Sequence, residues 1–221
     1  MYDSDNKIQY FDLSYQVYQK LKEMILNEEF KPGEKLLQEK IALMLGVSRT
    51  PLHKAFQMLE DEFLVESIPR RGIFVRKIDM DEIIDTFECR EVLEGLAAKR
   101  VASRITAEEI SNLKTIFEPF QNKNEIKIEE YHKCDQDFHH LIISISQNKI
   151  LQKMEILSNV MHKTNFHGLF RPPVETMIEH FNIIDAFEKK EALKAEQLMR
   201  EHLHKTVVAL KIKYKYLENI N

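Results

Sequence analysis

The chain has 221 residues, of which 43% are hydrophobic and 31% are charged, and its formal net charge is −4. This composition indicates a soluble, globular protein with one large or two smaller domains, and the acidic balance gives no overall signal for nucleic acid. No apolar run approaches the roughly 18 residues of a membrane span, no signal peptide is visible, and 2 cysteines cannot form a disulfide framework, so we expect a cytoplasmic protein.

Apolar residues recur at helical spacing from Leu13 to Ile25 and predict a first amphipathic helix. This helix ends before the turn at Pro32-Gly33, which contains both helix breakers. A second, short helix is predicted over about residues 37–45, and Gly46 suits its C-terminal end.

The third predicted helix has two distinct faces. Ser48 can cap it, and Pro51 falls in its first turn, where the missing N–H does no harm. One face is apolar, and the other carries long side chains that could reach base edges and phosphates. The apolar face comprises Leu52, Ala55, Phe56 and Leu59, and the polar face comprises Arg49, His53, Lys54 and Gln57. The pattern predicts a DNA-binding helix-turn-helix; the alternative is an ordinary amphipathic helix with a solvated polar face.

Two short strands are predicted over residues 64–68 and 72–76, around a tip formed by Pro69-Arg70-Arg71-Gly72. The stretch from Phe63 to Lys77 contains several basic residues and only one acidic residue, Glu66. Three helices followed by a hairpin make a winged helix-turn-helix, and a basic tip suits a wing that rests on the DNA backbone or in the minor groove.

Three motifs in this half resemble the DNA-binding domain of the GntR superfamily of bacterial regulators in their order and spacing. They are Pro32-Gly33-Glu34-Lys35-Leu36, Leu45-Gly46-Val47-Ser48-Arg49-Thr50-Pro51 and Pro69-Arg70-Arg71-Gly72-Ile73-Phe74-Val75. The resemblance implies that Arg49 and the wing tip around Arg71 and Gly72 contact DNA. His53 stands where the family usually has an arginine, so affinity or base preference should differ. The predicted DNA-binding set is Arg49, Thr50, His53, Lys54, Gln57, Arg70, Arg71 and Gly72.

A domain boundary is predicted between residues 77 and 78, and Asp79 can cap the helix that follows it. The fold class is therefore mostly α, with a winged helix-turn-helix over residues 1–77 and an all-helical bundle over residues 78–221. Thr106 and Glu109 form a capping box in the second domain. Its six predicted helices cover about residues 80–104, 106–121, 126–147, 149–169, 174–189 and 191–217.

Four polar residues of the second domain stand where apolar ones are expected. Asp135 and His139 are one helical turn apart, and His180 and His202 each lie in the apolar stripe of another helix. Three helices could therefore turn ligands into one core, where imidazole and carboxylate suit Zn²⁺ or another first-row divalent ion. The alternative is a set of hydrogen-bonded core histidines, because periodicity does not show that the four side chains converge. The remaining histidines are read as surface or boundary residues: His132, His140, His162, His167 and His204.

Arg90 also lies on a largely apolar helix face. One interpretation is an i,i+4 ion pair with Glu94. The other is a fork for the carboxylate of an effector.

Three further motifs resemble the effector-binding domain of the FadR subfamily, the FCD type, and six helices are similar to its VanR-type branch. They are Asp135-Gln136-Asp137-Phe138-His139, Glu179-His180 and Met199-Arg200-Glu201-His202-Leu203. The resemblance implies that Asp135 and the three histidines hold a divalent ion, with Zn²⁺ expected first and Ni²⁺ or Mn²⁺ as alternatives. It also implies an arginine, here Arg90, near the effector pocket.

The sequence favours a metabolite-responsive transcriptional regulator, expected to be a repressor, that acts as a homodimer on a pseudo-palindromic operator in double-stranded DNA. The resemblance implies a small organic acid as effector, since a carboxylate can bind both the ion and Arg90. A metal-dependent hydrolase is the rival, because three histidines and an aspartate around Zn²⁺ could activate water. Four protein ligands leave less room for water, and no general base is evident, so we expect no enzyme. A metal that only braces the bundle is the third possibility.

Overall fold

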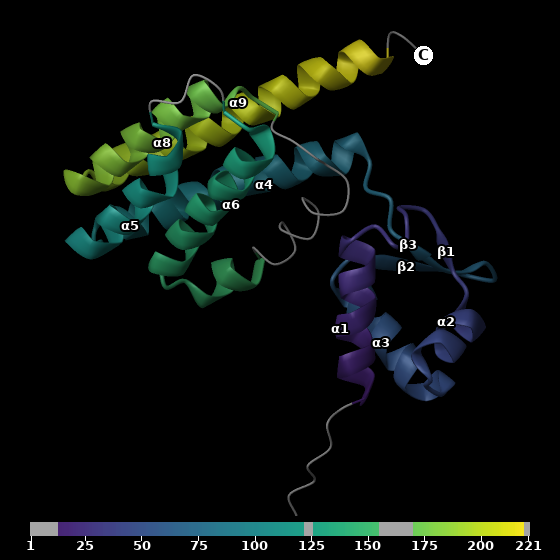
Figure 1. Ribbon diagram of the computed structural model, residues 1–221. Coiled ribbons are helices and arrows are strands. Elements are labelled where there is room, and N and C mark those ends of the chain that lie inside the picture. The colour runs from purple at the N-terminus through teal and green to yellow at the C-terminus, as the bar shows by residue number, and fades with distance from the viewer. Residues whose placement is uncertain (1–12, 122–125, 155–169, 219–221) are drawn as a thin grey trace, which may run out of the picture. The chain divides into compact units, whose positions relative to one another are not determined.

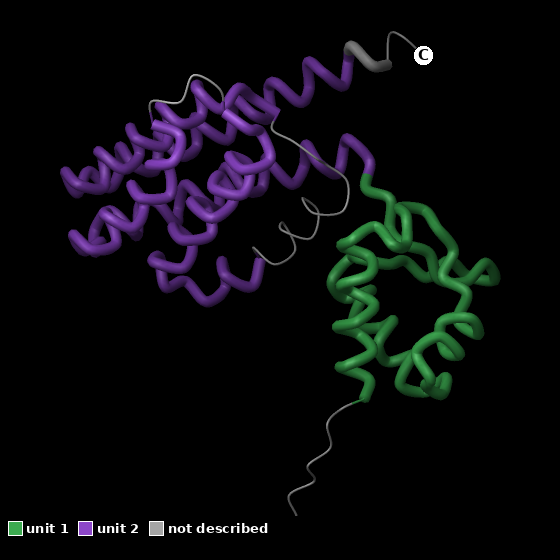
Figure 2. The backbone as a smooth tube through the Cα atoms, viewed as in Figure 1, with its two compact units in different colours: residues 1–78, 160–165 green, residues 79–159, 166–221 purple. Residues whose placement is uncertain are grey.

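The computed structural model describes residues 13–121, 126–154 and 170–218. The chain divides into two compact units, which are described separately below (Figure 2). The described residues of the first unit end at Ile78, and the second unit begins at Asp79. Among the described residues, no helix combines the length and the apolar character that crossing a membrane requires.

The first unit contains three helices and a small antiparallel sheet (Figure 1). The helices are α1 (Leu13–Leu26), α2 (Gln38–Leu45) and α3 (Arg49–Asp61), and the strands are β1 (Lys35–Leu36), β2 (Val65–Ile68) and β3 (Gly72–Val75). The strand order is β1-β3-β2, and β2 pairs with β3 in a register that sets Val65 opposite Val75 and Ile68 opposite Gly72. The predicted winged helix-turn-helix is confirmed, with β1 as an additional strand that sequence did not reveal.

Local sequence explains how α2 leads into α3. Gly46 follows α2 with φ +65°, the left-handed conformation that glycine adopts without strain, as predicted. Ser48 has the extended backbone of an N-cap, but its side chain makes no capping hydrogen bond to α3, so the prediction of a side-chain cap was wrong. The position of α3 therefore depends on packing more than on its N-cap.

The core of the first unit joins the three helices to the sheet. The apolar stripe of α3 is buried as predicted, and Leu52, Leu59 and Leu64 are each at most 1% exposed. Burying one such side chain contributes about 1.5–3 kcal/mol. Because α3 is anchored through this stripe, its opposite face is free to carry polar side chains.

In the described residues of the second unit, all regular secondary structure is helical. Its helices are α4 (Met80–Ala102), α5 (Ala107–Phe117), a 3-10 turn η1 (Glu118–Phe120), α6 (Ile128–Ile145), α8 (Pro173–Glu188) and α9 (Ala192–Glu218). Both predicted caps are confirmed, because Asp79 with Glu82 and Thr106 with Glu109 form capping boxes. Helical residues begin again at Lys149 and continue to Met154, and the rest of the helix predicted over 149–169 lies outside the described residues.

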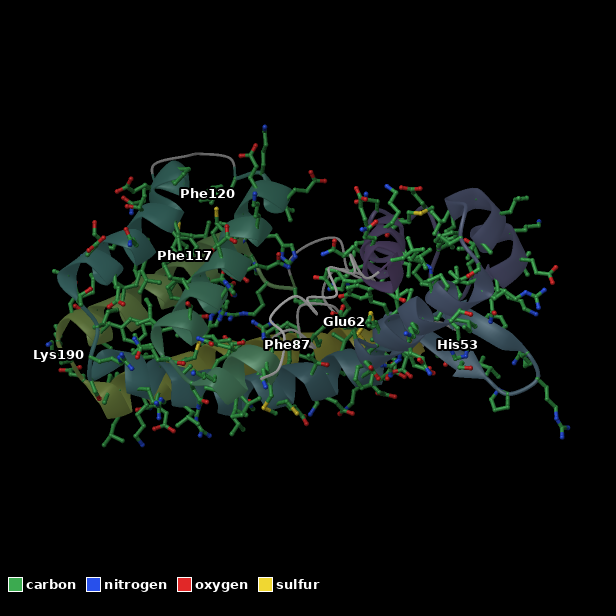
Figure 3. All side chains as sticks on the ribbon, turned by 90° about the horizontal axis from the view of Figure 1, so that it is seen from below. His53, Glu62, Phe87, Phe117, Phe120 and Lys190 are labelled. Carbon is green, nitrogen blue, oxygen red and sulfur yellow. The ribbon has the colours of Figure 1, made fainter. Side chains whose placement is uncertain are left out.

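Helix α4 packs along α9 more extensively than any other pair of described elements. A glycine makes this close approach possible, since a Cβ atom on Gly95 would lie 2.6 Å from Cγ of Arg200. Buried aromatic rings of α5 and α6 contact His180 of α8. The centroid of the Phe117 ring, which is labelled in Figure 3, lies 4.8 Å from the centroid of the His180 imidazole, and the two rings are stacked. The bundle thus brings the interior faces of α4, α6, α8 and α9 around a polar centre.

Candidate metal centre and DNA-facing surface

Four side chains from three helices meet in the interior of the second unit. Asp135 and His139 come from α6, His180 from α8 and His202 from α9, and one ligand atom of each lies within 4.8 Å of the others. The three histidines are at most 4% exposed, whereas the Asp135 side chain is 19% exposed. The structure therefore brings together the four residues that the sequence singled out.

The spacing of the donor atoms suits a small cation. Nε2 of His202 lies 3.3 Å from Nε2 of both His139 and His180, and Nε2 of His180 lies 3.4 Å from Oδ1 of Asp135. Two donors that are each about 2.0–2.1 Å from one tetrahedral ion stand about 3.3–3.4 Å apart. The nearest donor pairs thus already have the separation that one shared ion requires.

One buried and one largely buried carboxylate orient two of the three imidazoles. Nδ1 of His139 donates to Glu94 at 2.5 Å, and Nδ1 of His202 donates to Glu179 at 2.8 Å. A carboxylate hydrogen-bonded to the far nitrogen of a ligating histidine fixes both the ring orientation and the tautomer. Each of these histidines consequently directs Nε2 towards the centre.

The tautomers leave the centre electron-rich. Because an ionised carboxylate only accepts hydrogen bonds, Nδ1 of His139 and of His202 must carry the proton, and a neutral ring then has its lone pair on Nε2. These two lone pairs face one another across 3.3 Å in a buried site. Such an arrangement is repulsive on its own and becomes favourable when a cation lies between the nitrogens, so the residues fit a bound metal ion.

Protonation equilibria agree with this chemistry. Burial, together with the neighbouring histidines, lowers the pKa of His180 well below its ordinary value of 6.5, and burial also lowers the pKa of His202. The pKa values of Glu94 and Glu179 are lowered despite burial, because an arginine and a histidine hydrogen-bond to each carboxylate. Neutral imidazoles beside ionised carboxylates are the state that binds a divalent ion.

The third imidazole has a different support. Nδ1 of His180 lies 3.5 Å from the hydroxyl of Tyr131, and that hydroxyl lies 2.9 Å from Oγ1 of Thr176. Burial raises the pKa of Tyr131, which keeps the phenol neutral. A neutral phenol therefore stands beside His180 where the other two histidines have carboxylates.

Arg90 supports the centre through Glu94. Nε of Arg90 lies 2.6 Å from Oε1 of Glu94, while the other carboxylate oxygen of Glu94 accepts from His139. The guanidinium also lies over the ring of Phe87, which is labelled in Figure 3, with Cζ 4.8 Å from the ring centroid. The predicted ion pair with Glu94 is thus present, and a role for Arg90 in effector binding remains a hypothesis.

Sequence reasoning gave no role to several residues that support the ligands. These residues are Tyr131, Arg171, Thr176 and Glu179. Glu179 precedes His180 in one of the family motifs, which was the available signal. Arg171 had no such signal, because its contact with Glu179 depends on how the chain enters α8.

The remaining histidines lie outside the centre where they are described. His204 is 61% exposed in its side chain and Nδ1 lies 3.0 Å from Glu91, whereas His140 is exposed and His132 is half-buried. Cys134 is half-buried and does not belong to the ligand group. His162 and His167 lie outside the described residues.

In the first unit, the polar face of α3 is accessible. The predicted DNA-binding side chains of this helix are all exposed, and Figure 3 labels His53 among them. They are Arg49, Thr50, His53, Lys54 and Gln57. Arg49 forms an ion pair with Glu39 of α2 at 2.7 Å, in which both side chains are about four-fifths exposed, at 78% and 82%. An acid therefore stands beside the first cation of this helix.

The wing tip presents further positive charge. Arg70 and Arg71 are exposed, Arg70 has φ +63° and Gly72 has φ +107°. A Cβ atom on Gly72 would lie 3.2 Å from Cε of Lys35, so glycine allows this lysine to approach the turn. Lys35 and Arg71 both lie near the ring of Phe74, at 5.8 Å and 5.6 Å from its centroid. Lys35 is a further basic residue beside the wing tip, and the predicted DNA-binding set does not include it.

Comparison with protein families covers both units. Residues 13–75 match the family described as bacterial regulatory proteins, gntR family, and residues 85–205 match the FCD domain. The chain is 30% identical to the HTH-type transcriptional regulator YdhC of Bacillus subtilis over 196 residues, which cover 86% of this chain and 87% of that protein. It is 26% identical to the HTH-type transcriptional repressor RspR of Escherichia coli over 195 residues, which cover 86% of each protein.

Solved structures share the fold. McbR/YncC of Escherichia coli aligns with a TM-score of 0.68 at 21% identity, over 91% of this chain and 98% of that chain. A GntR transcriptional regulator from Rhodococcus sp. RHA1 aligns with a TM-score of 0.66 at 21% identity, over 89% and 96% of the two chains. These likenesses support a winged helix-turn-helix followed by a helical domain.

Proposed function

Because the chain belongs to the gntR family of bacterial regulatory proteins, as a transcriptional regulator with an FCD domain, we propose that its helical unit binds one divalent metal ion and senses a small carboxylate effector. The family assignment confirms the prediction of a DNA-binding regulator over the rival prediction of a hydrolase. The proposal therefore concerns how this cytoplasmic regulator receives its signal.

The observation that carries the metal proposal is the pair of facing imidazole lone pairs. His139 and His202 are each locked by a carboxylate in the tautomer that directs Nε2 inward, beside His180 and Asp135. Three nitrogen donors and one oxygen donor suit a borderline ion. We propose Zn²⁺ first, with Ni²⁺ or Mn²⁺ as alternatives. The ion would supply a positive charge to which an anionic group can bind.

Arg90 is proposed as the second contact for an effector carboxylate. Its guanidinium is largely buried beside Phe87 and already pairs with Glu94 at 2.6 Å. An effector would share this arginine with Glu94 or draw it away. Either change would alter the carboxylate that orients His139, and so would couple the effector to the ion in both directions.

We further propose that a homodimer binds a pseudo-palindromic operator and acts as a repressor. Helix-turn-helix domains of this family bind DNA and act as dimers. The proposed contacts are the exposed side chains of α3 and the basic wing, within residues 1–77, while residues 78–221 hold the ion and the effector. Two half-sites double the contact area, which specific affinity generally requires.

Native mass spectrometry of the purified protein tests the proposal directly. The expected result is a dimer with about one divalent ion per chain, and the removal of that ion by a chelator should lower the melting temperature, because the ion binds only the folded bundle. The effector response is then read as release of operator DNA by small organic acids from metal-loaded protein. Chains that hold no ion after incubation with Zn²⁺, Ni²⁺ or Mn²⁺ would refute the metal proposal. Equal effector responses with and without the ion would leave the metal a structural role only.

A further inference from the structure

We propose that Arg171 is a positioning residue for this metal centre and that it acts through Glu179 on His202. The inference rests on the proposed metal site and assigns one of its determinants of affinity. The residue lies immediately before Pro172-Pro173, where α8 begins, one short stretch of helix before His180 and far in sequence from the other three ligands.

Arg171 contacts both the side chain of Glu179 and the main chain of His202. Nη1 and Nη2 lie 2.7 Å from Oε2 and Oε1 of Glu179, so the guanidinium and the carboxylate form a two-point contact. Nη1 also donates to the backbone carbonyl of His202 at 3.2 Å. Arg171 therefore holds the carboxylate that orients the imidazole of His202 and the main chain that carries it.

Burial makes this contact effective. The Arg171 side chain is 8% exposed and the Glu179 side chain is 15% exposed. Charge-assisted, two-point hydrogen bonds fix a carboxylate more firmly than a single contact, and they are screened little when they are buried. If Arg171 were absent, the carboxylate of Glu179 could rotate away from Nδ1 of His202.

A second cation on the same carboxylate provides a natural comparison. Nζ of Lys205 lies 2.6 Å from Oε1 of Glu179, but its side chain is 57% exposed. A flexible, solvated ammonium contributes little to a fixed geometry. Mutating Arg171 and Lys205 in turn therefore distinguishes the effect of positive charge near Glu179 from the effect of holding its carboxylate in place.

The arrangement also explains why Arg171 differs from Arg90. Arg90 and Glu94 lie one turn apart on α4, so that pair is local to one helix. Arg171 instead joins Glu179 of α8 to the backbone of α9, the two helices that provide His180 and His202. It therefore fixes two metal ligands relative to each other, at the observed 3.3 Å between their Nε2 atoms.

The test measures the affinity of the full-length protein for Zn²⁺ and Co²⁺ by competition with a chromophoric chelator. Arg171→Met should weaken metal binding about 10–100-fold, the range typical when a supporting residue of a ligand is lost. Arg171→Lys keeps the charge without the two-point contact and should show a smaller loss. Lys205→Met is the matched control and should stay within about threefold of the wild type.

Two further readouts separate positioning from general stability. The visible absorption spectrum of the Co²⁺-loaded protein should change in Arg171→Lys, a variant that keeps the positive charge, and stay unchanged in Lys205→Met. In a double-mutant cycle, Arg171→Met should add little to the loss caused by Glu179→Gln, because both changes act through the same carboxylate. Wild-type affinity and an unchanged Co²⁺ spectrum in both Arg171 variants would overturn this inference alone. A wild-type protein that binds neither ion would overturn the metal proposal as well.

Discussion

Replacing Glu94 by glutamine should strongly destabilise the helical unit even without a metal ion. Glu94 is 3% exposed and accepts from both Arg90 and His139, at 2.6 Å and 2.5 Å. A glutamine amide is neutral, retains only one acceptor oxygen and turns its NH₂ group towards a donor, so Arg90 loses its ion pair with Glu94. Removing one partner of a buried ion pair costs about 3–5 kcal/mol. We expect a loss of that size in the free energy of unfolding.

The assay is urea unfolding of metal-free protein, followed by the far-UV circular dichroism of the helices. Glu88→Gln is the matched control, since it makes the same substitution on the same helix in a pair with Lys211 whose side chains are 48% and 51% exposed. That exposed pair should be worth about 0–1 kcal/mol. If Glu94→Gln costs no more than Glu88→Gln, the buried carboxylate does not stabilise the unit and the reasoning is wrong.

The pH dependence of stability in acid gives a second test of the role of Glu94. The neighbouring Arg90 and His139 hold the pKa of Glu94 below its ordinary value of 4.5. A carboxyl with a lowered pKa in the folded state stabilises the protein above its ordinary pKa, and this contribution is lost as the pH falls further. The difference in stability between wild type and Glu94→Gln should therefore shrink below pH 4.5.

Four further predictions concern the ligands, their protonation and the DNA-facing surface. His180→Ala and His202→Ala should each lower metal occupancy, whereas the exposed His204→Ala should not; full occupancy in both of the first two would show that the ligands are wrong. Metal-free protein should lose stability as the pH falls below 6.5, because histidines take up protons there in the unfolded chain, whereas His180 and His202 of the folded protein, with their lowered pKa values, do not. A flat pH–stability profile from pH 8 to 5.5 would contradict this prediction. Arg49→Ala should weaken operator binding by about 1–3 kcal/mol, while Glu39→Gln should strengthen non-specific binding by removing an acid from the DNA-facing surface; gel-shift titrations at several salt concentrations measure both changes. His53→Arg should change base preference at one or two operator positions, and an identical consensus from random-operator selection would exclude a base contact by His53.

The helical framework was predictable because it depends on local periodicity. The apolar stripe of α3 and the caps at Asp79 and Thr106 are encoded within a few residues and occur as expected. Strand β1 was missed because Lys35–Leu36 is too short to show the alternation of apolar and polar residues that identifies a strand. The side-chain cap by Ser48 was wrong because a residue type that can cap a helix need not form the hydrogen bond.

The metal ligands could be proposed from sequence, but their support could not. Asp135 and His139 lie one turn apart on α6, so their common direction was readable. Whether His180 and His202 reach the same point depends on how α8 and α9 pack. The supporting contacts of Arg171 also depend on that packing, because this residue contacts both α8 and α9. For Arg90, spacing allowed both an ion pair and an effector contact, and only the structure showed the pair with Glu94.

The pairing of largely buried arginines with largely buried carboxylates also sets the charge balance of the centre. Among the side chains of the centre that are less than one-fifth exposed, Glu94, Glu179 and Asp135 bring three negative charges, and Arg90 and Arg171 bring two positive ones. The charge of Lys205, which also contacts Glu179, is left out of this balance because its side chain is 57% exposed and screened by solvent. Neutral histidines add none, so the empty cluster carries a small negative excess, which a divalent ion converts into a positive excess of the same size. An anion would be repelled from the empty cluster and attracted to the loaded one. Occupancy by the ion therefore decides the sign of the charge that an approaching small molecule meets.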